Sequence, residues 1–405
     1  MMKKIVNGLL MMAVGIAMGS CVNDDTDFSH LIPLYQVEPA SVELDFSQLD
    51  EAPDVPVTDV NDSTYNDYVE NTTWDKVIYI EFIGDTAVVN GRVSGVAVST
   101  RGAHVVVTNL SGPVQFVLNG LTPDGSLKFY GDKRIQVLLN NIDITNPHGA
   151  AINNQGSKSM YVVMADGTTN HLQDGTQYVM DGDEDQKAAL FSEGQIIFSG
   201  RGRLNVTATG RGGIRSDDYI RIRPGVDIYI QSWALDALRA NDGIIMDGGV
   251  INVTTTGAGA KGVRSGSVMT VNGGRLVAIS SGDTRIENTA DALVDTTACA
   301  ALACDSMLIV NGGRLMLKAS GDGGKGINAK RDIDIHGGHI TAVATGTKLL
   351  KKPKGVKVDG NFSIDGGYFY SCSRRSDPVD VAGTTAVAQG YTTCSMEPKV
   401  WTIAY

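Results

Sequence analysis

The chain has 405 residues, a formal net charge of −11, 48 glycines and only 11 prolines. Acidic residues outnumber cationic ones, which argues against a nucleic-acid-binding protein. Five irregularly spaced cysteines without a histidine cluster argue against a zinc site.

The first twenty residues have the pattern of a targeting segment. Lys3 and Lys4 precede an uncharged apolar run from residue 5 to residue 18, and two small residues follow it. Because such a run is too short to remain as a membrane span, residues 1–20 are predicted to be a secretory signal peptide.

The small-small-Cys sequence that ends at Cys21 resembles a bacterial lipobox, with Met18 where leucine is commonest. The acidic pair Asp24 and Asp25 resembles the surface-export signal of Bacteroidetes lipoproteins. The resemblance implies lipidation of Cys21 and an outer-membrane protein on the cell surface. The alternative is a signal that merely ends beside a cysteine.

An acidic segment, residues 21–75, follows the signal. It holds 14 Asp and Glu after Cys21 and no Lys or Arg, so the rest of the chain is close to neutral. Like charges repel and extend a chain, which predicts a tether that holds a domain away from a membrane. The apolar patches LIPLY and VELDF could still pair with a partner or cap the domain.

A repeat fills most of the remaining sequence. A Gly-Gly pair recurs five times, and a second element of the type Gly/Ala-aliphatic-x-small recurs mostly at steps of 24 or 25 residues. The Gly-Gly pairs begin at residues 248, 273, 312, 337 and 366. A fixed period of this size predicts a solenoid, because one unit cannot bury its apolar face alone.

The repeat unit has the period of strands. In the segment 307–321, the apolar residues Leu308 and Val310, then Leu315 and Leu317, alternate with other residues. We therefore predict an all-β fold, a parallel β-helix of about 24 residues per coil over residues 76–395, with a C-terminal tail at 396–405. The right-handed sense is expected from the chirality of strand crossovers.

The run AAINNQGSKSMYVVMADGTTNHLQDG and the run QKAALFSEGQIIFSGRGRLNVTATGRGGIRSDDYIRI resemble the carbohydrate-binding β-helix proteins of clostridial cell surfaces. The similarity covers roughly Val77 to Gly367. It implies a pectate-lyase type of right-handed β-helix, bound calcium, polysaccharide as ligand, and no established catalysis. Some units that commonly read Asp-Asp-Gly-Ile in that family carry Arg or Lys here, while Asp217–Asp218 and Asp236 match.

One column of the repeat is cationic. Equivalent residues of stacked coils lie about 4.8 Å apart, and this column places Arg215, Arg239 and Arg264 in three consecutive coils, with Lys261 at the nearby corner. Stacked like charges need counter-charges. Either internal acids such as Asp236 neutralise the row, or an anionic ligand such as a polyuronate does, since guanidinium groups bind carboxylates bidentately.

A second column carries oxygen ligands. Glu193, Asp217 and Asn241 follow one another in adjacent coils, and Asp218 and Asp242 lie beside them. Calcium takes six to eight oxygen ligands, so these residues, with Asp236, are candidate ligands. The alternative is a ladder of side-chain hydrogen bonds at a turn. The acidic loop 181–185 is a second, weaker candidate.

Aromatic rings can cover the apolar face of a sugar. Trp233 should point outward just ahead of Asp236 and Arg239, and Tyr219 lies in the neighbouring coil, so both are candidate sugar contacts. Trp233 could equally pack beneath the long loop 174–185.

The remaining cysteines suggest structural roles. Cys372 and Cys394 flank the last coil and could staple it in an oxidising compartment. Cys304 falls in a column of small residues and is expected to be a buried filler.

Three functions are compatible with these patterns. The favoured one is a surface lipoprotein that binds polysaccharide, expected to be acidic, with calcium as a structural or bridging ion and other surface glycan-uptake proteins as possible partners. The second is a calcium-dependent polysaccharide lyase with Lys261 or Arg239 as base. The third is a structural adhesin or stalk without a ligand.

Overall fold

The computed structural model describes residues 51–179, 182–288, 294–387, 391–395 and 401–404. The expected signal peptide, Cys21 and the first half of the expected tether lie outside these residues. All described residues belong to one unit, Glu38–Tyr405. In the described part of the chain, no helix is long and apolar enough to cross a membrane.

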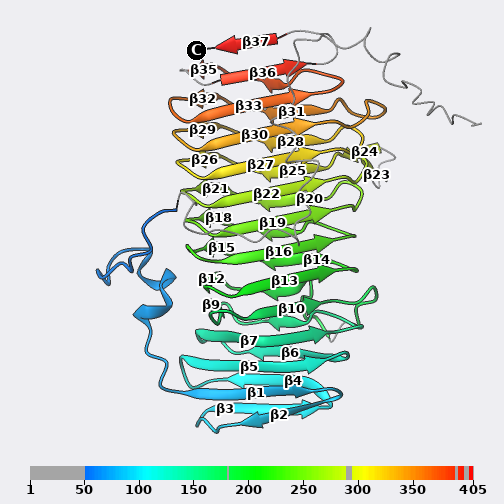
Figure 1. Ribbon diagram of the computed structural model, residues 1–405. Coiled ribbons are helices and arrows are strands. Elements are labelled where there is room, and N and C mark those ends of the chain that lie inside the picture. Colours follow the sequence, from blue (N-terminus) through cyan, green and yellow to red (C-terminus); the bar gives the residue numbers. More distant parts are fainter. Residues whose placement is uncertain (1–50, 180–181, 289–293, 388–390, 396–400, 405) are drawn as a thin grey trace, which may run out of the picture. The chain divides into compact units, whose positions relative to one another are not determined.

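The described residues form a parallel β-solenoid of about 11 turns with about 25 residues per turn (Figure 1). Within the described ranges, helix is confined to two short 3₁₀ segments ahead of the first strand, η3 (Tyr65–Asp67) and η4 (Val69–Asn71). The predicted all-β parallel coil is therefore confirmed, and its right-handed sense stays a prediction.

Each coil contributes one strand to each of three faces. The strands of face 1, which form one sheet, are β3 (Val96–Arg101), β4 (Ala103–Asn109), β6 (Gly125–Tyr130), β8 (Ile152–Asn154), β11 (Ala188–Ser192), β14 (Gly212–Ser216), β17 (Leu238–Ala240), β20 (Lys261–Ser265), β25 (Ala300–Cys304), β28 (Lys325–Ala329), β31 (Lys354–Val358) and β34 (Val379–Val381).

Face 2 follows face 1 along the chain. Its strands are β9 (Met160–Met164), β12 (Ile196–Gly200), β15 (Tyr219–Ile222), β18 (Gly243–Met246), β21 (Val268–Val271), β26 (Leu308–Val310), β29 (Ile333–Ile335), β32 (Phe362–Ile364) and β35 (Thr385–Val387).

Face 3 closes each coil. Its strands are β2 (Thr86–Asn90), β1 (Val77–Ile83), β5 (Val114–Thr122), β7 (Ile135–Thr145), β10 (Thr169–Gln173), β13 (Arg203–Ala208), β16 (Asp227–Ser232), β19 (Val250–Thr255), β22 (Arg275–Ser280), β27 (Arg314–Ala319), β30 (His339–Ala344), β33 (Tyr368–Ser373), β36 (Tyr391–Ser395) and β37 (Trp401–Ala404). The long strand β7 pairs with both β9 and β10, so it joins faces 2 and 3.

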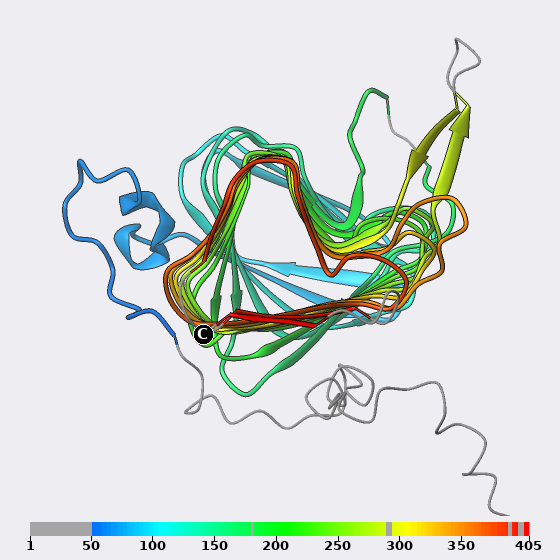
Figure 2. The same ribbon diagram turned by 90° about the horizontal axis from the view of Figure 1, so that it is seen from above.

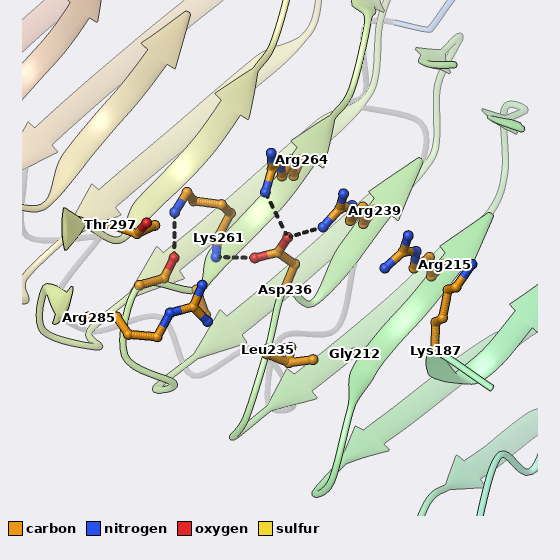
Figure 3. Close-up of a pocket in the computed structure, with 12 residues that line it drawn as sticks. Lys187, Gly212, Arg215, Leu235, Asp236, Arg239, Lys261, Arg264, Arg285 and Thr297 are labelled. Carbon is orange, nitrogen blue, oxygen red and sulfur yellow. Dashed lines mark hydrogen bonds and ion pairs between the residues drawn. The ribbon is translucent and has the colours of Figure 1, made fainter. Parts of the chain in front are cut away.

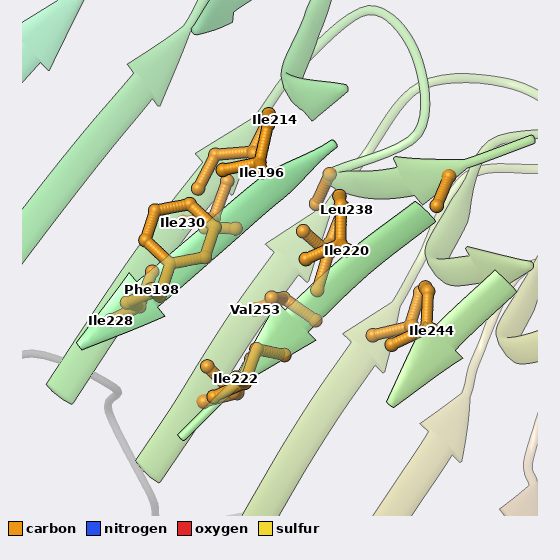
Figure 4. Packing of buried hydrophobic residues seen from close by; sticks show 14 of the residues in the cluster. Ile196, Phe198, Ile214, Ile220, Ile222, Ile228, Ile230, Leu238, Ile244 and Val253 are labelled. Carbon is orange, nitrogen blue, oxygen red and sulfur yellow. The ribbon is translucent and has the colours of Figure 1, made fainter. Parts of the chain in front are cut away.

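The core consists of stacked columns of aliphatic side chains. Ile196, Ile220 and Ile244 are register partners in three successive coils, and all are fully buried (Figure 4). Burial of each such side chain stabilises the fold by about 1.5–3 kcal/mol. Because the alternation of the sequence puts one aliphatic residue of every coil in each column, the repeat itself generates the core.

The Gly-Gly pairs form a corner between faces 2 and 3. Their second glycines, Gly249, Gly274, Gly313, Gly338 and Gly367, have φ angles between +75° and +84°. Residues with a Cβ rarely adopt this left-handed conformation. The recurring pair therefore marks a backbone requirement of the coil.

Antiparallel strands cover both ends of the stack. The pairs β1–β2 and β3–β4 begin it, and β37 pairs with β36 at its end. Residues 401–404 of the expected tail thus belong to the sheet. Cys372 is disulfide-bonded, and Cys394 is its register partner in the next strand. The side chain of Cys394 lies outside the description.

Residues 51–72, the second half of the expected tether, lie against the solenoid, and we call this segment the strap. Arg223 pairs with Asp54 and Glu70 at 2.8 Å, and Arg221 pairs with Asp67 at 2.8 Å. An extended acidic chain was expected from repulsion between its own charges. The two buried arginines of the coil form ion pairs with these acids and hold the segment against the solenoid.

Candidate functional site

Lengthened corners build a wall on one side of face 1. In ordinary coils two to six residues connect face 3 to face 1, and in most of them five, as at 256–260 and 320–324. Three connections are longer: 174–187, 281–299 and 345–353. The second contains the antiparallel hairpin β23 (Arg285–Asn288) and β24 (Val294–Thr297), which projects from the stack on the same side as the other two (Figure 2).

Buried aspartates hold two of these corners in place. Asp174 accepts hydrogen bonds from the backbone N–H groups of Thr209, Gly210 and Arg211. Asp322 accepts from the N–H groups of Leu349 and Leu350. These hydrogen bonds to the carboxylate lower the pKa of Asp322 despite its burial. Hydrogen bonds thus tie the start of the corner 174–187 and the corner 345–353 to neighbouring coils.

The predicted arginine column is present on face 1. Arg215 is the register partner of Arg239, and Arg239 is the register partner of Arg264. Their side chains are 20–28% exposed, so each is partly covered. The structure brings the three guanidinium groups together beside Lys261, as Figure 3 shows.

Counter-charges are distributed unevenly along this column. Asp217 pairs with Arg215 at 3.1 Å, and Asp305 pairs with Arg264 at 2.9 Å. Asp236 lies 3.6 Å from Arg239 and 3.9 Å from Arg264 (Figure 3).

Arg239 is therefore the least neutralised member of the column. Burial and repulsion from Arg215 and Arg264 lower the pKa of Arg239. Its buried Nε atom has no hydrogen-bond partner within the described protein, which leaves a donor in the middle of the row.

Two adjoining pockets form a basic groove over face 1. The arginine pocket is lined by Lys187, Arg215, Arg239, Lys261, Arg264 and Arg285, with Asp236 as the one acidic residue among its lining residues. The lysine pocket shares Lys261, Arg264 and Arg285 and adds six lysines, against five aspartates. The added lysines are Lys325, Lys330, Lys351, Lys352, Lys354 and Lys357. An excess of positive charge thus runs along several coils.

Two lysines beneath the groove are buried among backbone carbonyls. The Lys261 ammonium donates to the carbonyl oxygens of Gly259 and Ala298, and Lys325 donates to that of Gly323. Burial lowers the pKa of both amines to about 8. Lys354, the next lysine of the same column, instead pairs with Asp377 and Asp380.

The affinity of the groove for an anionic ligand should fall as pH rises through about 8, because Lys261 and Lys325 lose their charge there. The folded pKa of about 8 lies below the ordinary value of 10.5, so the stability of the fold should rise between these two pH values. Titration of binding and of the unfolding midpoint against pH checks both signs. The double variant K261M/K325M should flatten both profiles, and wild-type profiles of the opposite slope would contradict the assignment.

An acidic cluster borders the arginine pocket. Carboxylate oxygens of Asp185, Glu193 and Asp217 lie within 4.8 Å of one another. Asn241 donates to Asp217 at 2.9 Å. Burial, followed by the neighbouring charge of Asp217, raises the pKa of Glu193. The structure thus joins three predicted ligands to Asp185, a member of the acidic loop that was the weaker candidate.

Lys187 occupies a central place in this cluster. Its ammonium group lies 2.5 Å from Asp185 and also pairs with Asp217. The cluster therefore carries an internal cation. The three carboxylates are ligands of the type that calcium prefers. For the ion to bind, the Lys187 ammonium group would have to move away from Asp185 and Asp217.

The other predicted residues lie elsewhere. Asp218 accepts from Gln195 and from the N–H of Tyr219, at the start of face 2. Asp242 is exposed beside it. Asp236 lies at the other end of the face 1 strand, among the arginines. These three acids do not belong to the cluster of Asp217.

The two candidate aromatic contacts differ in environment. Trp233 is 54% exposed, as expected for an outward side chain just ahead of the arginine pocket. The Tyr219 hydroxyl donates to Asp67 of the strap, and burial and that carboxylate raise the pKa of Tyr219. Tyr219 is thus engaged by the strap on face 2 and is not part of the groove.

Sequence reasoning missed Lys187 and Arg285 because both lie in lengthened corners outside the repeat columns. The strap contacts of Arg221 were missed as well. A usable signal was present in the sequence, because Tyr219 and Arg221 stand at alternate positions and so face outward from the strand. A large polar pair on one outward face indicates that another segment could cover it.

A family model described as "Carbohydrate-binding domain-containing protein" matches residues 101–322. A protein of the same description from Acetivibrio thermocellus is 28% identical over 138 residues, which are 33% of this chain and 46% of that protein. The match thus spans about half the length of this relative.

A solved structure titled "Structure of the polysaccharide lyase-like protein from C. thermocellum, Gadolinium derivative" covers 77% of this chain and 97% of its own. The two share 20% sequence identity with a TM-score of 0.44.

Proposed function

Because the chain belongs to the family of carbohydrate-binding domain-containing proteins, we propose that it binds an acidic polysaccharide in the basic groove without cleaving it. Family membership supports a polysaccharide as the ligand. The acidic character of that polysaccharide is inferred from the groove alone.

The observation that carries this proposal is the incomplete neutralisation of Arg239. Its nearest carboxylate, Asp236, lies 3.6 Å away and is shared with Arg264. A bound carboxylate could accept hydrogen bonds from these guanidinium groups and relieve their mutual repulsion. Because the protein's own carboxylates neutralise Arg239 only in part, we assign the remaining counter-charge to a ligand.

The spacing of the coils favours a polymeric ligand. Successive rungs of face 1 are about 4.8 Å apart, and lining residues of the groove run from Lys187 to Lys357. A polyuronate carries a carboxylate on every sugar along an extended chain. Such a chain could contact cations of several coils at once, which raises its avidity over that of a single sugar.

Affinity electrophoresis tests the proposal. The purified domain is run through gels containing polygalacturonate, a neutral glucan or no polymer, with and without chelator, and the same mixtures are assayed for the ultraviolet absorbance of unsaturated chain ends. Retardation by the acidic polymer alone, without absorbance, is the expected result. Equal mobility in all gels would refute binding and favour the structural-stalk function.

A lyase is the second candidate, favoured by the lowered pKa of Lys261 in a pocket with four arginines. Binding is preferred because the Lys261 ammonium already donates to two carbonyl oxygens and the residue is only 7% exposed. Growth of ultraviolet absorbance in the assay above would reverse this preference.

Calcium binding is part of the proposal. Asp185, Glu193 and Asp217 would hold the ion and Asn241 could add an amide oxygen. A bound calcium would supply positive charge beside the groove and could bridge to a ligand carboxylate.

Replacement of Lys187 by Gln should increase calcium affinity about tenfold or more, because the variant removes the cation that competes for Asp185 and Asp217. Isothermal titration with calcium checks this result, and E193Q should abolish the gain. Unchanged calcium affinity in K187Q would remove the cluster from consideration as a metal site.

The proposal also includes a lipid anchor on Cys21, a position on the outer-membrane surface and partners in glycan uptake. These rest on the sequence pattern around Cys21 and on the resemblance described above. Metabolic labelling with a radioactive fatty acid, compared between wild type and C21S, tests the anchor.

A further inference from the structure

Exposed apolar side chains lie on the corners that border the basic groove. Five of them lie on the corners between faces 3 and 1 and form what we call the apolar rim: Trp233, Leu235, Ile286, Leu349 and Leu350. Leu349 is 82% exposed, Ile286 and Leu350 are each 55% exposed, and Leu235 is 37% exposed. Single exposed apolar residues are common on protein surfaces, but several of them beside one groove indicate a surface that a ligand covers.

The rim residues adjoin the cations of the groove. Leu235 itself lines the arginine pocket (Figure 3). Ile286 follows Arg285, and its cross-strand partner Thr296 lines the lysine pocket. Leu350 precedes Lys351, which lines the same pocket. Cationic and apolar residues thus lie next to one another at three corners that border the groove.

The two leucines are held outward by a fixed loop. The connection 345–353 exceeds the ordinary five-residue corner by four residues, and its added sequence contains Leu349 and Leu350. Buried Asp322 binds the N–H groups of both leucines and the hydroxyl of Thr347. Ordering a loop that exposes two leucines to water is unfavourable unless a ligand covers them.

The arrangement suits a linear ligand. From the corner before β17 to the corner before β31 the rim passes over four coil steps of about 4.8 Å each. The apolar residues are spread over three corners that also carry cations of the groove, whereas a protein partner or a membrane would be matched by a compact apolar patch.

We propose that the acidic polysaccharide bound in the groove is O-acylated, with ester groups such as acetyl packing against the apolar rim. Carboxylates bind the arginines and lysines on the floor and wall, and acyl methyl groups reach the aliphatic side chains. A fully hydroxylated uronan offers these aliphatic side chains only the C–H faces of its sugar rings, whereas an acyl ester adds a methyl group that they can cover. This inference rests on the proposed function and specifies its ligand.

The test uses one polymer in two forms. An O-acetylated polyuronate and the same sample after mild alkaline de-O-acetylation, matched in chain length, are compared by isothermal titration with the wild-type domain. The acetylated form should bind about fivefold more tightly or better, as expected for burial of one or two methyl groups. Equal affinities would overturn the inference and leave the proposed function standing, whereas binding of neither form would overturn the proposed function.

Rim variants separate a ligand contact from a structural role. I286S combined with L349S and L350S should lose the preference for the acetylated form and retain the affinity of wild type for the de-acetylated form. L110S, which changes a 69% exposed leucine of the turn after β4, is the matched control and should keep the preference. Equal loss of both forms, or a dimer by light scattering that the rim variant abolishes, would contradict the inference.

Discussion

Replacement of Arg239 by Gln should weaken binding of an acidic polysaccharide by about ten- to a hundredfold, the range expected for loss of one or two hydrogen bonds to a charged group. Arg239 is the central and least neutralised guanidinium of the groove. The same variant should unfold at an unchanged or higher temperature, because burial and two neighbouring arginines disfavour the charge of Arg239 in the folded chain. Titration calorimetry and thermal denaturation measure the two effects.

The opposite direction of these effects makes the test specific. If Arg239 were purely structural, its replacement would lower the stability of the protein. If it binds the ligand, its replacement lowers the affinity of the protein for the polysaccharide. Arg201, an exposed residue of the turn between β12 and β13, supplies the control variant R201Q, which should change neither quantity. Undiminished affinity in R239Q would remove the arginine column as the binding site.

Replacement of Asp67 by Asn should release the strap and destabilise the solenoid beside it by about 3 kcal/mol, the lower end of the range for breaking a buried ion pair. Asp67 is 3% exposed, pairs with Arg221 and accepts a hydrogen bond from Tyr219. Arg221 keeps Asp247 as a second partner at 2.6 Å, which limits the loss.

Limited proteolysis is the suitable measurement, because a solenoid need not unfold in one step. Cleavage between residues 51 and 76 should be faster in D67N than in wild type, and the unfolding midpoint should be lower. D62N is the matched control on the same strap, because exposed Asp62 binds its near neighbour Thr64. A strap that resists protease equally in D67N and wild type would show that other contacts hold it.

The coil and the arginine column could be predicted because both depend on the repeat. In a parallel ladder the register partner of Arg215 is the residue one sequence period later, so alignment of the repeats gives Arg239 and Arg264 directly. The exposed position of Trp233 followed from the same alternation.

The strap and the acidic cluster could not be predicted in the same way. Asp67 and Arg221 are separated by 154 residues, and a single contact between distant segments leaves no periodic signal. Lys187 and Asp185 lie in a lengthened corner, which has no counterpart in the ordinary coils. Charge counting placed 14 acids between residues 21 and 75 but gave no hint that three of them, Asp54, Asp67 and Glu70, have arginine partners.

The position of Glu51 has a mechanical consequence. Its carboxylate accepts hydrogen bonds from the N–H groups of Gly225 and Gly249, at corners near the middle of the stack and on the flank away from the hairpin (Figure 2). A pull on the chain upstream of Glu51 would therefore act broadside, at mid-length, and not on either terminal coil. The load would fall on the strap before it reaches any strand of the solenoid.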